Sequence, residues 1–313
     1  MSYDVQMAIY LATVALNLAQ AVAVGAAMAA LWLGNATAAW SAAQLRRLRP
    51  VRIGATVAAI AALGALLPLV SASMAEVPVV EAGEAIGAMF SESHFGLAWK
   101  AGMVALLVAA LAAVVPVSGQ RLRYVALANL LALAAALYTR SMVSHAAADG
   151  DVSVAMFVDW THLCLISAWV GVVFIAGFIN LTGFVPDHAT GRGEAERYVE
   201  NLSSSATFAL CGIFATGLFN AWHNLGGIAG LVGNAYGSVL LLKLALVALA
   251  ALLGGFNRFI VMPSLLASLR GSQVGAPEPL RRFRLILRIE ALVLLAVLVA
   301  AAILSATPPP TAA

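Results

Sequence analysis

The stretch Arg140–Gly171, RSMVSHAAADGDVSVAMFVDWTHLCLISAWVG, shows how this chain is built. One apolar run ends near its start, a polar link follows at Asp149, Gly150 and Asp151, and a second apolar run begins. Each run reaches about 20 residues, the length that an α-helix needs to cross a bilayer. The stretch therefore predicts two adjacent, antiparallel membrane helices joined by a short link.

The whole chain repeats this pattern. Of its 313 residues, 63% are hydrophobic and only 10% are charged, whereas soluble domains carry about 25% charged residues. We therefore expect an all-α integral membrane protein in one membrane domain, residues 1–313. The first run is too long for the apolar core of a signal peptide, so we count it as a span. The eight expected transmembrane helices are 6–33, 51–72, 97–117, 123–143, 154–184, 202–223, 237–262 and 286–306.

The arginines indicate the orientation of these spans and exclude one class of partner. Fourteen of the seventeen basic residues lie on or beside alternate links. The positive-inside rule assigns those links to the cytoplasm, so both termini are expected outside. Because the arginines are confined to short links between spans, the net charge of +3 does not indicate nucleic-acid binding. They are Arg46, Arg47, Arg49, Arg52, Arg121, Arg123, Arg192, Arg197, Arg258, Arg270, Arg281, Arg282, Arg284 and Arg288.

Two segments of the chain resemble each other. The stretch from His94 to Lys100 and the stretch from Tyr236 to Lys243 each open a span with an aromatic–glycine pair and reach a lysine. This similarity favours an internal repeat of two four-helix halves with the same orientation in the membrane, a parallel repeat of residues 1–145 and 146–313. Lys100 and Lys243 are then expected to occupy matching positions and to extend toward the outer interface.

Residue types that can bind a metal gather in the stretch 140–171, on both sides of its polar link; we call this segment the 140–171 link. Met142 and His145 are three residues apart, as are Asp159 and His162, so each pair shares a helix face; Met156 lies near the same level. Ionisable groups at this depth are rare and are usually paired or functional. Two interpretations follow: a metal or proton site, or an Asp–His ion pair that joins two helices. Thioethers suit Cu(I) and imidazole suits either copper ion, although methionine is also ordinary membrane packing.

Three further ionisable residues are candidates for function. His223 and His94 lie at the outer ends of spans, where they are either peripheral ligands or ordinary interfacial residues. Glu290 lies about a turn inside the cytoplasmic boundary of the last span. We expect it either to pair with Arg288 or Arg258 or to gate a path.

The order of short motifs from residue 144 onward resembles the CopD family of inner-membrane copper resistance and copper uptake proteins. Ser144 stands where that family has glycine, and the resemblance is looser before residue 140. The matching motifs are Ser144-His145-Ala146, Asp159-Trp-Thr-His162, Trp169-Val-Gly171, Thr216-Gly217, Tyr236-Gly237 with Lys243, Asn257-Arg258, Glu290 and Thr307-Pro308-Pro309.

This resemblance implies copper handling in the bacterial inner membrane, with both termini periplasmic. His145 and His162 would bind copper at the periplasmic face, with Asp159 as a hydrogen-bond partner of a ligand or as a third ligand, and Met142 and Met156 as soft ligands. The protein would import or transfer the ion, would not be an enzyme, and would receive copper from a periplasmic CopC-type protein. Two alternatives stay open: a b-type haem electron-transfer protein with membrane histidines as axial ligands, and a copper-delivery assembly factor that does not transport.

Overall fold

The computed structural model describes residues 3–182, 186, 188–225, 231–271 and 277–308, and nearly all of them are helical. Within these ranges, eight helices are long and apolar enough to cross a membrane, which confirms the predicted fold class. They are α1 (Tyr3–Leu33), α2 (Ala39–Ala75), α4 (His94–Val114), α5 (Gly119–Ser141), α6 (Val154–Ile175), α7 (Ala189–Leu225), α8 (Ala235–Phe256) and α10 (Pro277–Ser305).

Two helices begin about three turns earlier than the expected spans. Helix α2 begins at Ala39 rather than at 51, and α7 begins at Ala189 rather than at 202. In both cases the additional segment is polar and contains arginines. Hydropathy identifies only the part of a helix that lies in lipid, whereas the helix itself continues wherever its backbone bonds are satisfied.

Short elements connect and extend the long helices. Helix α3 (Gly83–Glu92) precedes α4, and a 3₁₀ turn, η2 (His145–Asp149), separates α5 from α6. Single π-helical turns follow α6 and α8, and such turns are frequent at functional sites. The remaining short elements are η1 (Val79–Glu81), the π turns η3 (Ala176–Asn180) and η5 (Asn257–Val261), and α9 (Met262–Arg270).

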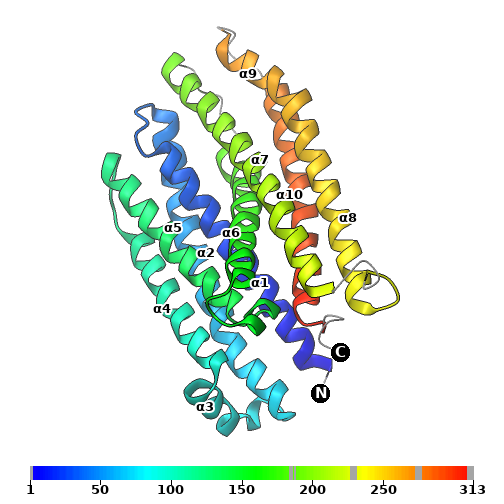
Figure 1. Cartoon of the computed structure of the whole chain (residues 1–313). Coiled ribbons are helices and arrows are strands. Elements are labelled where there is room, and N and C mark those ends of the chain that lie inside the picture. Colours follow the sequence, from blue (N-terminus) through cyan, green and yellow to red (C-terminus); the bar gives the residue numbers. More distant parts are fainter. Residues whose placement is uncertain (1–2, 183–185, 187, 226–230, 272–276, 309–313) are drawn as a thin grey trace.

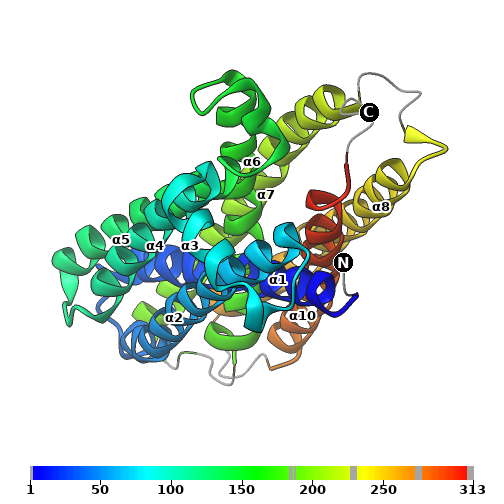
Figure 2. The same cartoon turned by 90° about the horizontal axis from the view of Figure 1, so that it is seen from below.

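Helix α1 lies at the centre of the bundle and packs against α2, α5, α6 and α10 (Figure 1). Helices α4 and α5 lie on one side of it and α8 lies on the other, as the view along the bundle shows (Figure 2). Helix α8 packs mainly on α10, and α7 mainly on α6. Although α7 and α8 are consecutive, their backbones come close at few points; Leu225 at the end of α7 packs with Tyr236 and Leu240 of α8. The repeat relation between the two four-helix halves stays a prediction.

The tightest crossing in the bundle joins α1 to α6. Gly25 and Gly171 face each other there, and a Cβ atom at either position would overlap the backbone of the other helix. Small residues at such crossings allow two membrane helices to approach closely. The glycine of the Trp-x-Gly motif, Gly171, is therefore required for packing.

Arginines at one end of the bundle cap the ends of neighbouring helices. Arg52 donates to the Ala113 carbonyl at 3.0 Å, near the C-terminus of α4, and Arg288 donates to the Gly177 carbonyl at 3.0 Å, beyond α6. Cationic donors suit these positions because the last carbonyls of a helix are unsatisfied and carry partial negative charge. The first turn of α1 and the last turn of α10 lie at the opposite end (Figure 1).

Candidate functional site

A cavity of about 440 Å³ lies among η2, α6, α7, α8 and α10, toward the end of the bundle where α1 begins. His145, Asp159 and His162 all line this outer cavity, so the structure brings these three predicted residues together. Met142 and Met156 do not line it, and Met156 is completely buried in the protein. As far as the described residues line it, the outer cavity therefore presents imidazole and oxygen donors and no thioether.

Thr216 fixes the orientation of the His162 ring. His162 is only 9% exposed, and its Nδ1 lies 2.9 Å from the Thr216 hydroxyl oxygen. That hydroxyl donates its one proton to the Gly212 carbonyl at 2.7 Å, so it accepts a hydrogen bond from Nδ1–H. The neutral ring then carries its lone pair on Nε2. A Cβ at Gly217 would lie 3.4 Å from the ring, so the Thr-Gly step both holds the imidazole and leaves room for it.

His145 supplies an unsatisfied nitrogen to the same cavity. It is the first residue of η2, and its ring contacts that of Tyr236 edge to face, with centroids 6.5 Å apart. Its Nε2 is buried and has no hydrogen-bond partner. A buried polar atom without a partner costs about 1–3 kcal/mol. A bound metal ion would satisfy this nitrogen.

Asp159 bonds to two neutral side chains in the described structure. Its Oδ2 accepts from the Ser144 hydroxyl at 3.0 Å, and its Oδ1 accepts from the Asn220 amide at 3.3 Å. Among the described residues it forms no ion pair with a histidine, so the Asp–His pair considered from the sequence is absent there. Ser144, the departure from the family's glycine, instead holds the carboxylate.

Two cations accompany Asp159 at the outer cavity. Arg140 and Lys243 both line it and interact electrostatically with the Asp159 carboxylate. The Arg140 Nε is buried without a hydrogen-bond partner. Lys100, the expected counterpart of Lys243, lies outside this cavity, 4.9 Å from the centre of the Phe90 ring. The two lysines therefore have different surroundings.

The two peripheral histidines pair with acids of the 140–171 link. His223 lines the outer cavity, and its Nε2 lies 3.2 Å from Asp149. His94 lies outside the cavity, with its Nε2 at 2.9 Å from Asp151. Across the described ranges, no three His, Cys, Asp or Glu side chains converge into a metal cage. Any copper site here must rest on fewer of these ligands, together with amide or hydroxyl donors.

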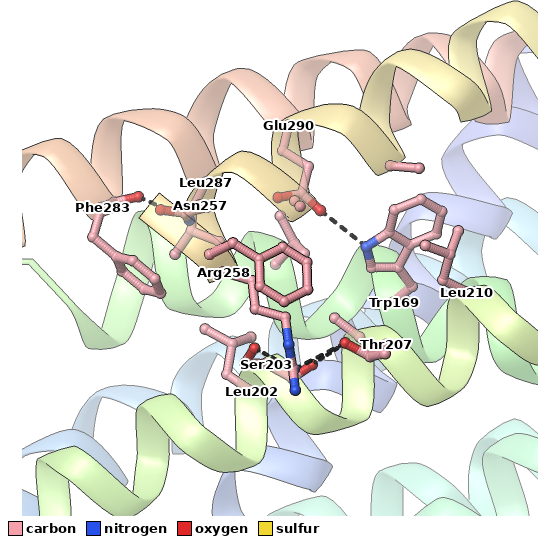
Figure 3. Close-up of a pocket in the computed structure, with 16 residues that line it drawn as sticks. Trp169, Leu202, Ser203, Thr207, Leu210, Asn257, Arg258, Phe283, Leu287 and Glu290 are labelled. Atoms are coloured by element: carbon pink, nitrogen blue, oxygen red, sulfur yellow. Dashed lines mark hydrogen bonds between the residues drawn. The ribbon is translucent and has the colours of Figure 1, made fainter. Parts of the chain in front are cut away.

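A second cavity, of about 240 Å³, lies among α6, α7, α8, η5 and α10 and contains Glu290 (Figure 3). The Glu290 Oε1 accepts from the Trp169 indole at 2.9 Å. Arg258 lines this inner cavity but donates to Ser203 at 2.7 Å and to Thr207 at 2.9 Å (Figure 3). Neither Arg258 nor Arg288 pairs with Glu290, so the pairing expected from the sequence is not formed.

The two cavities follow one another along the same helices. Each of α6, α7 and α8 contributes residues to both cavities. On each helix, the outer-cavity residue and the inner-cavity residue that are nearest in sequence are three or four positions apart, about one helical turn. Only a thin apolar layer therefore separates them. The residues at its two faces are Ile166 and Trp169 on α6, Ile213 and Leu210 on α7, and Val247 and Ala251 on α8.

Two family models match the chain and together cover most of it. The model for copper resistance protein D matches residues 196–304, and the model for the copper resistance protein D-like N-terminal domain matches residues 4–156. The chain belongs to the copper resistance protein D family. No curated protein and no solved structure matches it.

Membership of the copper resistance protein D family makes the chain a multi-pass membrane protein with a role in copper resistance or uptake. The N-terminal match extends the family over the part of the sequence where the motifs are looser. The motifs themselves gather at the two cavities. Thr216-Gly217 holds His162 in the outer cavity, and Trp169 holds Glu290 in the inner one.

Sequence reasoning missed Arg140 and the role of Thr216. By residue type alone, Arg140 cannot be distinguished from the arginines of the alternate links. It lies at the opposite end of the bundle from the arginine caps, where it lines the outer cavity. The sequence offered one indication: Arg140, like Lys100 and Lys243, does not lie on the arginine-bearing links. Thr216 is 54 positions from His162, so no local spacing could connect the two residues.

Proposed function

We propose that this copper resistance protein D family member binds copper in its outer cavity, at the periplasmic face, and carries it inward through the inner cavity. His145 and His162 are the proposed ligands. The observation that carries the proposal is the buried, unpartnered Nε2 of His145 in a cavity that His162 also lines. Imidazole nitrogen is a suitable copper ligand, and both side chains come from elements joined by the 140–171 link.

The charges around the cavity favour the monovalent ion. Arg140 and Lys243 contribute two positive charges against one carboxylate, Asp159. Repulsion of a bound ion is proportional to its charge, so it is half as large for Cu(I) as for Cu(II). We therefore propose Cu(I) as the ion, with Asp159 near the site as charge compensation. Met142 and Met156 do not line the cavity, so we do not propose them as ligands here.

Orientation is proposed from the arginines. The end of the bundle with the arginine caps would face the cytoplasm, which places the outer cavity and both chain ends at the periplasmic face of the bacterial inner membrane. A periplasmic CopC-type protein would then supply copper to the outer cavity. His223 and Asp149 would stand beside the ligands.

The sequence of cavities favours transport over delivery to another membrane protein. A delivery factor needs a site at one face, whereas here a second cavity follows the first with about one helical turn between them. Buried ionisable groups in a membrane domain mark ion pathways. Glu290 continues the series of such groups beyond the outer cavity.

Copper titration of purified variants tests the ligands, and uptake into proteoliposomes tests the path. His145→Ala and His162→Ala should each lose stoichiometric Cu(I) binding, and uptake should stop in both. His94→Ala is the matched control, because His94 contacts the same segment through Asp151 but lies outside the cavity.

Retention of wild-type copper affinity by both His145→Ala and His162→Ala would exclude this site. Equal loss in the His94→Ala control would indicate damage to the fold instead of removal of a ligand. Binding without uptake would favour the delivery alternative.

A further inference from the structure

Glu290 is a buried carboxylate without a cationic partner. It is 2% exposed in the middle of α10, and one oxygen accepts from Trp169. A Cβ at Gly254 would lie 3.2 Å from Oε1, so the glycine of α8 leaves room for the carboxyl group. Among the described residues no cation lies within ion-pair distance of Glu290.

The charged groups on the elements around α10 are engaged elsewhere. Arg288 of the same helix and Arg258 of η5 have other hydrogen-bond partners. On α6 and α8, four such groups belong to the outer cavity, and Cys164 lines neither cavity; the four are Asp159, His162, Tyr236 and Lys243. The remaining groups are Arg281, Arg282 and Glu278, which pair together, Arg284, which caps Leu181, Arg270 of α9, which pairs with Glu196 and Glu200, and Asp4 and Tyr10 in the first turns of α1.

The side chains that line the inner cavity indicate which ion Glu290 binds. Among the described residues that line it there is no histidine, methionine or cysteine, and its uncharged polar groups include Ser203, Thr207 and Asn257. Copper prefers nitrogen and sulfur ligands, and a hard metal ion needs several oxygens with no cation such as Arg258 among them. A proton needs one carboxylate oxygen. An uncompensated carboxylate at this depth is costly, and a proton removes that charge.

We propose that Glu290 is a proton-exchanging group that compensates the charge of Cu(I) as it passes the inner cavity. This inference rests on the proposed function. As the ion crosses the apolar layer, the O–H bond of the Glu290 carboxyl breaks, its electron pair stays on the carboxylate, and the proton leaves to the cytoplasmic side. When copper moves on to the cytoplasm, one proton returns from that side. No net proton crosses the membrane, and the charge added by one Cu(I) is offset by the one H⁺ released.

Infrared difference spectroscopy tests the proton exchange without copper. A pH titration of the purified protein should show the carbonyl stretch of a protonated carboxyl group that Glu290→Gln lacks. Glu278→Gln is the matched control, because Glu278 lies on the same helix but is exposed and paired with Arg281 and Arg282. Identical difference spectra for Glu290→Gln and the wild type would overturn the inference.

Should Glu290→Gln fail to fold, Trp169→Phe supplies a second test. It keeps the carboxyl group but removes its hydrogen-bond donor, so the same carbonyl band should move to higher frequency. An unmoved band would show that the titrating carboxyl is not Glu290.

Proteoliposome uptake tests the coupling. Wild-type uptake should depend on the pH of the compartment facing the arginine caps, and Glu290→Gln should lose this dependence and slow at least about tenfold, the effect of a barrier change near 1.4 kcal/mol. Unchanged uptake and pH dependence in Glu290→Gln would refute the coupling. If the wild type shows the titrating band but no uptake, the transport proposal fails while the assignment of the proton site holds.

Discussion

Replacing Thr216 with valine tests whether the outer site works through the orientation of His162. The hydroxyl accepts from Nδ1–H at 2.9 Å and so leaves Nε2 free to bind copper. Valine has nearly the same shape but cannot accept. The metal-bound state would then hold a buried N–H without a partner, while the metal-free ring could turn or move its proton to Nε2.

The expected magnitude follows from this difference between the two states. A buried donor without a partner costs about 1–3 kcal/mol, which corresponds to a loss of about 5–150-fold in affinity. Partners of metal-bound histidines typically contribute about 10–100-fold. We therefore expect Thr216→Val to bind Cu(I) about 10–100-fold more weakly, measured by competition with a chelator of known affinity.

Thr207→Val is the matched control for this experiment. Thr207 lies on the same helix, and its hydroxyl also bonds to a side-chain nitrogen, that of Arg258, but in the inner cavity. Its Cu(I) affinity should remain that of the wild type, and Thr216→Ser should restore most of the loss. Wild-type affinity in Thr216→Val would refute the argument from the His162 tautomer.

Two further substitutions test the charge of the outer cavity and the central crossing. Lys243→Met removes a positive charge that repels the ion and should raise Cu(I) affinity severalfold, whereas Lys100→Met should leave it unchanged; weaker binding in Lys243→Met would instead assign the lysine a direct role in the site. Gly171→Ala should lower the free energy of unfolding by about 1–3 kcal/mol because its Cβ overlaps the backbone of α1. Gly193→Ala, with open space around the added carbon, is the control, and equal melting temperatures for the two variants would contradict the close crossing.

The number and type of the helices could be predicted from the sequence because the length of an apolar run determines whether it crosses a bilayer. Helical spacing across one short link placed His145, Asp159 and His162 near each other, and all three line the outer cavity, although they do not converge into a metal cage among the described residues. The same argument from spacing wrongly grouped Met156 with the residues that line the cavity. Two residues three apart differ by about 60° around a helix, enough for Met156 to be completely buried while Asp159 lines the cavity.

Partners far apart in sequence could not be predicted. Glu290 and Trp169 are separated by 121 positions, and their hydrogen bond depends on how α6 and α10 pack. The same limit applies to Lys243, whose expected match with Lys100 rested on local similarity. Packing against different neighbours gives the two lysines different surroundings.

The Gly25–Gly171 crossing has a mechanical consequence. Two helices in backbone contact cannot rotate against each other without separating, so α1 and α6 act as one stiff strut through the middle of the protein. Helices α7 and α8 both line the two cavities, and the π turn η5 directly follows α8. We therefore expect any movement that opens the apolar layer to take place in α7 and α8 and not between α1 and α6.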